Sequence, residues 1–211
     1  MIVTNEFLMS EEDEPKENKK EDNGPGFLNK KMEQIFFEKR AIYLWGVVDD
    51  KSAKDIVTKL LLLDADKSGA DIKFYINSPG GVVTSGMVMF DTMNLIKSPV
   101  HTICMGLAAS MGSILLSMGE KGKRTIFPHG EVMIHQPSGA IGGQASDIEI
   151  TAREIKKLRS ELYAITAHHT GKDEATIAKD SDRDFWMTAA DAKEYGLVDE
   201  VLLTNPRKEN K

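Results

Sequence analysis

The chain has 211 residues, of which 41% are hydrophobic and 7% aromatic, and its formal net charge is −6. This length allows one substantial hydrophobic core or two small ones. The negative charge excludes a general nucleic-acid-binding protein, because such proteins present a strongly basic surface. The one basic cluster, Lys121–Arg124, is short and is predicted to form a solvated turn.

The single cysteine excludes an internal disulfide bond and any cysteine-rich metal site. Cys104 lies in an apolar run, which favours a buried, inert thiol over a nucleophile. The N-terminus lacks the basic and apolar regions of a secretory signal, and no apolar stretch is long enough to span a bilayer. We therefore expect a cytoplasmic protein that does not bind membranes.

Two polar segments border the predicted folded domain. Residues 10–26 are charged and turn-forming and contain no apolar residue. Because such a segment cannot offset the entropy cost of its own ordering, residues 1–26 are predicted to be disordered or removed by processing. Residues 27–203 are predicted to fold, and residues 204–211 to form a short polar tail.

Strand-like and helix-like segments alternate along the predicted domain. Strands are predicted at residues 41–48, 71–76, 100–105, 125–127 and 131–134. Helices are predicted at residues 49–66, 84–96, 107–119 and 144–169. Asp49 or Asp50 supplies the cap of the first helix, and Ile56, Leu60 and Leu63 share its apolar face. The alternation predicts an α/β fold of layered sheet and helices, but it leaves the topology open.

Two segments offer a candidate nucleophile and a candidate base. Ser110 is predicted in the first turn of a helix among small residues, where backbone amides favour an anion. Tight helix packing would explain this serine equally well. His135 closes an apolar strand, where a base can face a cleft on a rigid support. The alternative for His135 is an imidazole that only hydrogen-bonds the backbone.

Two further segments could complete such a site. Adjacent glycines in Ser78–Val82 leave backbone N–H groups accessible, as an oxyanion site requires, although a simple turn is the alternative. Three aspartates precede two aromatic residues, and the sequence chemistry does not choose which of them could hold an imidazole. They are Asp180, Asp182 and Asp184. Weaker candidates for a base are His101, His129, His168 and His169, the last two near a helix end.

The order of these segments resembles the ClpP family of ATP-dependent protease subunits over residues 40–203. The matching runs are YINSPGG, GLAASMGS, KGKR, VMIHQP, GQASDIEITAREI and EYGLVDEVL. The resemblance implies the α/β ClpP fold, a crotonase-like ββα superhelix, with a projecting strand–helix handle at about residues 136–169. It also implies a serine endopeptidase that cleaves unfolded proteins to short peptides.

The resemblance implies a role for individual residues. The nucleophile would be Ser110, the base His135, the acid Asp184, and the oxyanion donors the backbone amides of Gly81 and Met111. Here the resemblance chooses Asp184 among the three aspartates, which the sequence chemistry could not do. Asp182 and Arg183 match positions that form ion pairs between rings.

The resemblance also implies an assembly and a partner. Members of the family form two stacked heptameric rings that enclose a chamber, so a homo-oligomer is expected. Unfolded polypeptides would be delivered by an AAA+ unfoldase such as ClpX, ClpA or ClpC. No cofactor is expected in this chain, because the implied peptide cleavage uses no metal or organic cofactor. ATP and magnesium would be used by the unfoldase, since this chain lacks a GxxxxGK[ST] phosphate loop.

Some positions depart from the family pattern. Residues 1–26 do not match the family's axial gate, and Lys73 and Thr125 replace aromatic residues of the pocket that docks the unfoldase, although Tyr75 is retained. One alternative is therefore a divergent paralogue that acts as a structural or regulatory subunit of mixed rings. Another is an acyl-CoA enzyme of the crotonase fold, but such enzymes use no Ser–His–Asp triad.

Overall fold

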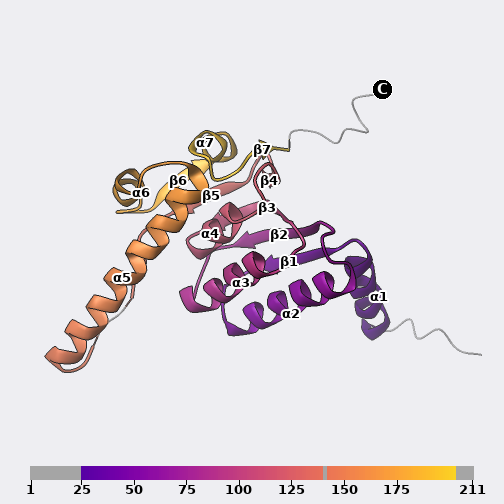
Figure 1. Cartoon of the computed structure of the whole chain (residues 1–211), viewed down its shortest axis with the longest axis horizontal. Coiled ribbons are helices and arrows are strands. Elements are labelled where there is room, and N and C mark those ends of the chain that lie inside the picture. Colours follow the sequence, from indigo (N-terminus) through magenta and orange to yellow (C-terminus); the bar gives the residue numbers. More distant parts are fainter. Residues whose placement is uncertain (1–24, 140–141, 203–211) are drawn as a thin grey trace, which may run out of the picture. The chain divides into compact units, whose positions relative to one another are not determined.

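The computed structural model describes residues 25–139 and 142–202 (Figure 1). Most of the segment predicted to be disordered, residues 1–24, and the predicted tail lie outside these residues. The chain divides into two compact units, residues 1–34 and 35–211. Helix α1 (Pro25–Glu38), which the sequence patterns did not predict, begins within the N-terminal unit and ends within the larger one.

The larger unit is built on a seven-stranded sheet. Six of its strands are parallel, and five of them follow one another in the order β1 (Ala41–Trp45), β2 (Ile72–Ser78), β3 (Val100–Ala109), β4 (Arg124–Ile126) and β7 (Glu200–Val201). The first half of β3 pairs with β4 and its second half pairs with β5 (Glu131–Ile134), also in parallel. Strand β6 (Phe185–Thr188) then pairs with β5 in the antiparallel direction.

Within the described residues, six helices lie entirely in the larger unit. They are α2 (Asp50–Asp66), α3 (Val83–Leu95), α4 (Met111–Ser117), α5 (Ala145–Thr170), α6 (Glu174–Asp180) and α7 (Ala189–Tyr195). Helix α2 buries Ile56, Leu60 and Leu63, as predicted. The Asp49 carboxylate caps it by accepting a 2.8 Å hydrogen bond from the backbone N–H of Ser52. The predicted face and cap of this helix are confirmed.

The core lies between the sheet and helices α2, α3 and α4. Phe74 and Ile76 of β2, Cys104 of β3, and Leu115 and Leu116 of α4 are fully buried. Because the carboxyl ends of parallel strands meet at one edge of a sheet, the segments after β2, β3 and β5 lie near one another. These segments contain the glycine pair, the candidate nucleophile and the candidate base.

Two predicted boundaries are wrong. Strand β1 ends at Trp45, not at residue 48. Helix α4 begins at Met111, not at residue 107, because β3 continues through Ala109. Leu107 and Ala109 pair with Glu131 and Met133 of β5, and this pairing outweighs the helix-like pattern of small residues. Elements β6, β7, α6 and α7 were not predicted from the sequence.

The projecting helix of the predicted handle is α5, which extends away from the sheet in Figure 1. Its only buried side chains, Leu162, Thr166 and Ala167, lie in its C-terminal half. Ile148 and Ile150 in its N-terminal half are 40% and 57% exposed. Residues 136–139 form irregular chain, not a strand: the Gln136 N–H donates to the Ser181 carbonyl at 2.6 Å, but no ladder with a described strand continues from it. Within residues 25–139 and 142–202, no helix combines the length and apolarity needed to cross a bilayer.

Candidate active site

Ser110 lies between β3 and α4, with no further residue in the connection. Its backbone has φ 53° and ψ −122°, a conformation that non-glycine residues rarely adopt and that costs about 1–3 kcal/mol. The Ser110 N–H donates to the carbonyl of Met133 at 2.9 Å, and the Ser110 carbonyl accepts from the N–H of Ser113 at 2.9 Å. These bonds hold the strained residue in the junction. Ser110 therefore precedes the first helical turn, whereas the sequence predicted it inside that turn.

The imidazole of His135 connects Ser110 to Asp184. Its Nε2 lies 2.8 Å from Ser110 Oγ, and its Nδ1 lies 2.9 Å from Asp184 Oδ1. A carboxylate can only accept a hydrogen bond, so Nδ1 carries the hydrogen and donates to Asp184. Nε2 is then free to accept from the serine hydroxyl, and this is the tautomer that a general base needs.

The structure separates the three candidate aspartates. Asp180 accepts a 3.0 Å hydrogen bond from the hydroxyl of Tyr195. Asp182 accepts from the side-chain amide of Gln136, at its backbone carbonyl and at Oδ1. Only Asp184 lies against the imidazole of His135. The geometry thus agrees with the choice that the family resemblance made.

The glycine pair after β2 lies directly against the serine. Gly80 has φ +90°, and a Cβ atom there would lie 2.7 Å from both Ser110 Cβ and the carbonyl oxygen of Ala109. Gly81 has φ +151°, and its Cβ would collide with the carbonyl of Val48. In the described part of the chain, the backbone N–H groups of Gly81 and Met111 donate to no acceptor outside regular secondary structure. Gly80 was not singled out from the sequence, although its neighbour was.

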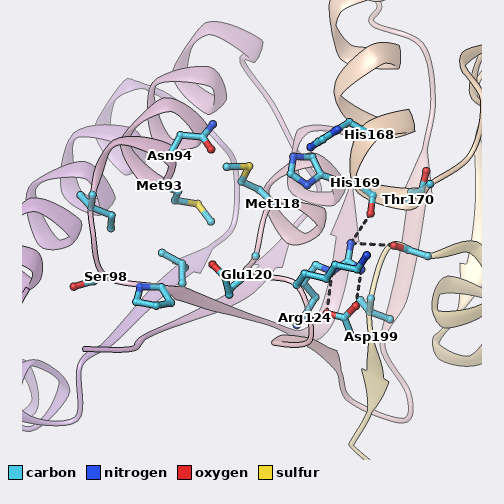
Figure 2. Close-up of a pocket in the computed structure, with 18 of the residues that line it drawn as sticks. Met93, Asn94, Ser98, Met118, Glu120, Arg124, His168, His169, Thr170 and Asp199 are labelled. Carbon is cyan, nitrogen blue, oxygen red and sulfur yellow. Dashed lines mark hydrogen bonds and ion pairs between the residues drawn. The ribbon is translucent and has the colours of Figure 1, made fainter. Parts of the chain in front are cut away.

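A small cavity of about 30 Å³ opens beside Ser110 and His135. Its apolar lining includes Val83, Ile114 and Leu162, with Tyr163 and Thr166 among the polar residues. A much larger cavity, of about 770 Å³, lies elsewhere and includes none of the three triad residues (Figure 2). A third cavity, of about 710 Å³, includes His135 and Asp184 in its lining, so size alone does not single out the cavity beside Ser110.

The remaining candidate nucleophile and bases do not contact Ser110. Cys104 is fully buried, and burial raises the pKa of its thiol to about 11, which supports the inert role expected for it. In the described part of the chain, none of the other four histidines hydrogen-bonds a triad residue. They are His101, His129, His168 and His169. As predicted, His168 and His169 lie at the end of a helix, just before Gly171.

The prediction for the basic cluster is wrong at Arg124. The residues before it form a turn, but Arg124 begins β4 and its side chain is only 7% exposed. Its guanidinium binds both carboxylate oxygens of Asp199, at 2.6 and 3.0 Å (Figure 2). It also donates to the carbonyls of Ser117, His169 and Gly196, at the C-terminal ends of three helices. These five acceptors explain why a cation can be buried here.

A serine hydroxyl, an imidazole and a carboxylate linked in this order define the site of a serine hydrolase. A family model described as Clp protease matches residues 27–205. The ATP-dependent Clp protease proteolytic subunit of Bacteroides fragilis is 57% identical over 164 residues, which cover 78% of this chain and 79% of the relative. The protein of the same name from Bacteroides thetaiotaomicron is 56% identical over 164 residues, covering 78% of this chain and 74% of the relative.

The chain therefore belongs to the Clp protease family, and it is a serine peptidase. The ClpP fold expected from the sequence resemblance is confirmed. The predicted ion pair between rings stays a prediction. Within the chain, Arg183 Nε lies 4.0 Å from Asp182 Oδ2, and both side chains are exposed.

Proposed function

We propose that this chain is the proteolytic subunit of an ATP-dependent Clp protease, with Ser110 as nucleophile, His135 as base and Asp184 as orienting acid. The observation that supports these roles is the pair of hydrogen bonds, 2.8 and 2.9 Å long, that joins the three side chains. The names of the relatives support the activity.

Catalysis would proceed by acyl transfer. Ser110 Oγ attacks the carbonyl carbon of the scissile peptide bond while His135 Nε2 accepts its proton. Asp184 stabilises the imidazolium that forms and keeps its orientation. His135 then protonates the leaving amine, and a water molecule, activated by the same imidazole, hydrolyses the acyl-enzyme.

The negative charge that develops on the substrate oxygen needs hydrogen-bond donors. The backbone N–H groups of Gly81 and Met111 fit this role. Met111 follows Ser110, Gly81 follows the glycine that lies against Ser110, and neither N–H has a competing acceptor outside regular secondary structure in the described residues. Removal of one such donor costs about 3–4 kcal/mol in transition-state stabilisation in comparable enzymes. The apolar cavity beside Ser110 would receive an apolar side chain of the substrate.

The active form would be a homo-oligomer of two stacked heptameric rings. The N-terminal half of α5 supports this, because it has no buried side chain in the single chain and exposes Ile148 and Ile150. An isolated helix of this kind gains stability mainly by packing against another surface. Asp182 and Arg183 would form ion pairs between the rings.

An AAA+ unfoldase such as ClpX, ClpA or ClpC would supply unfolded polypeptides to the chamber. The names of the relatives include ATP dependence. ATP and magnesium would belong to the unfoldase, and the peptidase chain would use no cofactor of its own. Tyr75, retained from the family's docking pocket, stacks on Tyr43 with 4.8 Å between ring centroids. We expect this activity in the cytoplasm.

The test is to incubate the purified protein and its Ser110→Ala variant with a fluorogenic short peptide and, separately, with a fluorophosphonate. The proposal predicts covalent labelling at Ser110 and peptide cleavage that the substitution abolishes. Labelling without cleavage, even after addition of an unfoldase, would favour the structural or regulatory paralogue, which the comparisons do not favour. Acyl-CoA turnover without labelling would contradict the peptidase mechanism.

A further inference from the structure

Asp184 has few contacts of its own. Its side chain is 59% exposed, and its carboxylate accepts a single hydrogen bond in the described structure, from His135. No cation or backbone N–H in residues 25–139 and 142–202 holds its second oxygen. The position of this carboxylate must therefore depend on the backbone that carries it.

That backbone is fixed on both sides of Asp184. On the C-terminal side, Phe185 begins β6 and pairs with Ile134 of β5. On the N-terminal side, the N–H groups of Ser181 and Asp182 donate to the carbonyls of Ile177 and Lys179, and Gln136 adds three further bonds. Its backbone N–H donates to the carbonyl of Ser181 at 2.6 Å. Its side-chain Nε2 donates to the carbonyl of Asp182 at 2.9 Å and to Asp182 Oδ1 at 3.2 Å.

Gln136 directly follows His135 in the chain. The same short segment thus carries the imidazole and ties down the loop that carries its carboxylate partner. If the side-chain amide of Gln136 is lost, the loop keeps its anchor at Phe185 but loses the side-chain bonds at Asp182. Asp184 lies between these two anchors, so its distance from His135 Nδ1 depends on both.

Arg159, on the handle helix α5, sets which way the amide of Gln136 points. Its NH1 donates to Gln136 Oε1 at 3.4 Å. An amide oxygen only accepts and an amide nitrogen only donates, so this contact turns Nε2 of Gln136 toward Asp182. The handle helix is thereby connected to the acid of the triad through two side chains.

We propose that Gln136 is a positioning residue for the His135–Asp184 pair, and that Arg159 orients its amide. This inference rests on the proposed roles of the triad. Gln136 touches neither substrate nor reacting atoms and acts only by holding Asp184 at the imidazole.

The experiment compares Gln136→Ala and Gln136→Glu with wild type, using the fluorogenic peptide and the rate of fluorophosphonate labelling. The glutamate carboxylate can still accept from Arg159 but cannot donate to Asp182. Both variants should therefore lose the side-chain hydrogen bonds that hold Asp182. Because a displacement of about 1 Å can cost about 10²-fold, we expect kcat and the labelling rate to fall by up to about 10²-fold, with KM unchanged. Arg159→Ala should show a smaller loss. Asn94→Ala, an exposed amide at the far end of α3 with no side-chain hydrogen bond to the triad, is the control and should match wild type.

A double-mutant cycle separates positioning from general stability. In an Asp184→Asn background, Gln136→Ala should have little further effect on labelling, because its only route to the chemistry has already been lost. An equal loss in both backgrounds would overturn the inference, as would a kcat within threefold of wild type in both Gln136 variants. If neither variant folds, Gln136 is structural and the inference is also wrong. Retained cleavage in Ser110→Ala would instead refute the proposed function itself.

Discussion

Two carboxylates in this molecule form similar pairs in very different surroundings. Asp199 pairs with Arg124, whose guanidinium has five acceptors and is only 7% exposed. Asp199 also accepts from the backbone N–H groups of Gly122 and Arg124. Asp184 pairs with His135 by one hydrogen bond and is 59% exposed. Many hydrogen bonds fix the position of the first pair, whereas the position of the second depends on the backbone around it.

The difference follows from what each pair does. The Arg124 guanidinium binds the carbonyl ends of α4, α5 and α7, so it joins three helices to β4. A pair of this kind stabilises the fold best when its geometry is fixed. In the proposed mechanism the His135–Asp184 pair would gain and lose a proton at each catalytic cycle, and a solvent-accessible site beside Ser110 would permit substrate entry. Stability and catalysis should therefore respond to different substitutions.

The largest expected effect is on catalysis. Asp184→Asn should lower kcat by about 10⁴-fold, because an amide can donate to Nδ1 and so stabilise the wrong tautomer of His135. The thermal unfolding temperature should stay that of wild type, since Asp184 is exposed and has one partner. Peptide hydrolysis and calorimetry on the same sample check both statements. A large fall in stability would show that this pair is structural as well.

The second substitution should reverse that pattern. Arg124→Met leaves Asp199 partly buried without its cation, which costs about 3–5 kcal/mol of folding stability when one partner of a buried pair is removed. The kcat of the molecules that remain folded should be unchanged, because Arg124 contacts no triad residue. Thermal unfolding and active-site titration with a fluorophosphonate measure the two quantities separately. Unchanged stability would contradict the structural role of this pair.

The third substitution, Gly80→Ala, should mainly lower kcat. A Cβ at φ +90° would press on Ser110 Cβ and the Ala109 carbonyl, so the nucleophile must shift, at a cost of about 10²-fold in rate. Gly69→Ala is the matched control, because Gly69 has φ +82° but open space around its Cβ position. That control should lose a little stability and no activity. Equal kcat values for the two variants would rule out the close approach at Gly80.

The fourth expectation concerns acid stability. Burial raises the pKa of Asp199, but the hydrogen bonds and charge of Arg124 outweigh it and hold that pKa below its usual value. A carboxyl group with a lowered pKa contributes stability above its unfolded-state pKa of about 3.9, and this contribution is lost as pH falls through the folded-state value. Wild type should lose more stability than Arg124→Met as the pH is lowered below about 4. Thermal unfolding at a series of pH values measures the difference, and parallel curves would contradict it.

The smallest effect is expected at Cys104. Burial raises the pKa of its thiol to about 11, and the side chain is fully buried. Iodoacetamide at pH 8 should leave the native protein unmodified and modify it fully in denaturant. Mass spectrometry of the intact protein reads both results. Rapid native alkylation would show that the core around β3 opens readily.

The sequence predicted the parts of the fold that local chemistry determines. The cap at Asp49 and the buried face of α2 follow from residue type and spacing alone, and both were predicted correctly. The end of β3 was not, since residues 107–109 become a strand only through pairing with β5, which is distant in sequence. The burial of Arg124 depends on carbonyls from three helices and was missed for the same reason.

For the site, the sequence supplied chemistry but not geometry. Ser110 was recognisable as a candidate from its predicted place in the first turn of a helix, and His135 from its place at the end of a strand. The choice of Asp184 over Asp180 and Asp182 needed the family resemblance, because three aspartates spaced two residues apart look alike until their partners are known. Gln136 gave no signal of its own, since an amide beside a histidine is ordinary. Its bonds to the Asp182 loop appear only once the chain is folded.

The divided pairing of β3 has one more consequence. Past its midpoint the strand leaves β4 for β5, so the sheet forks there, and His135 and Asp184 lie on the β5–β6 limb of the fork. Ser110 follows β3 itself, and the glycine pair follows β2, which pairs with β3 on its other side. A slight shear of the β5–β6 limb against β3 would therefore move the imidazole and its carboxylate together, relative to the serine and the proposed oxyanion donors. The proposed nucleophile and its base are thus supported by separate parts of one sheet.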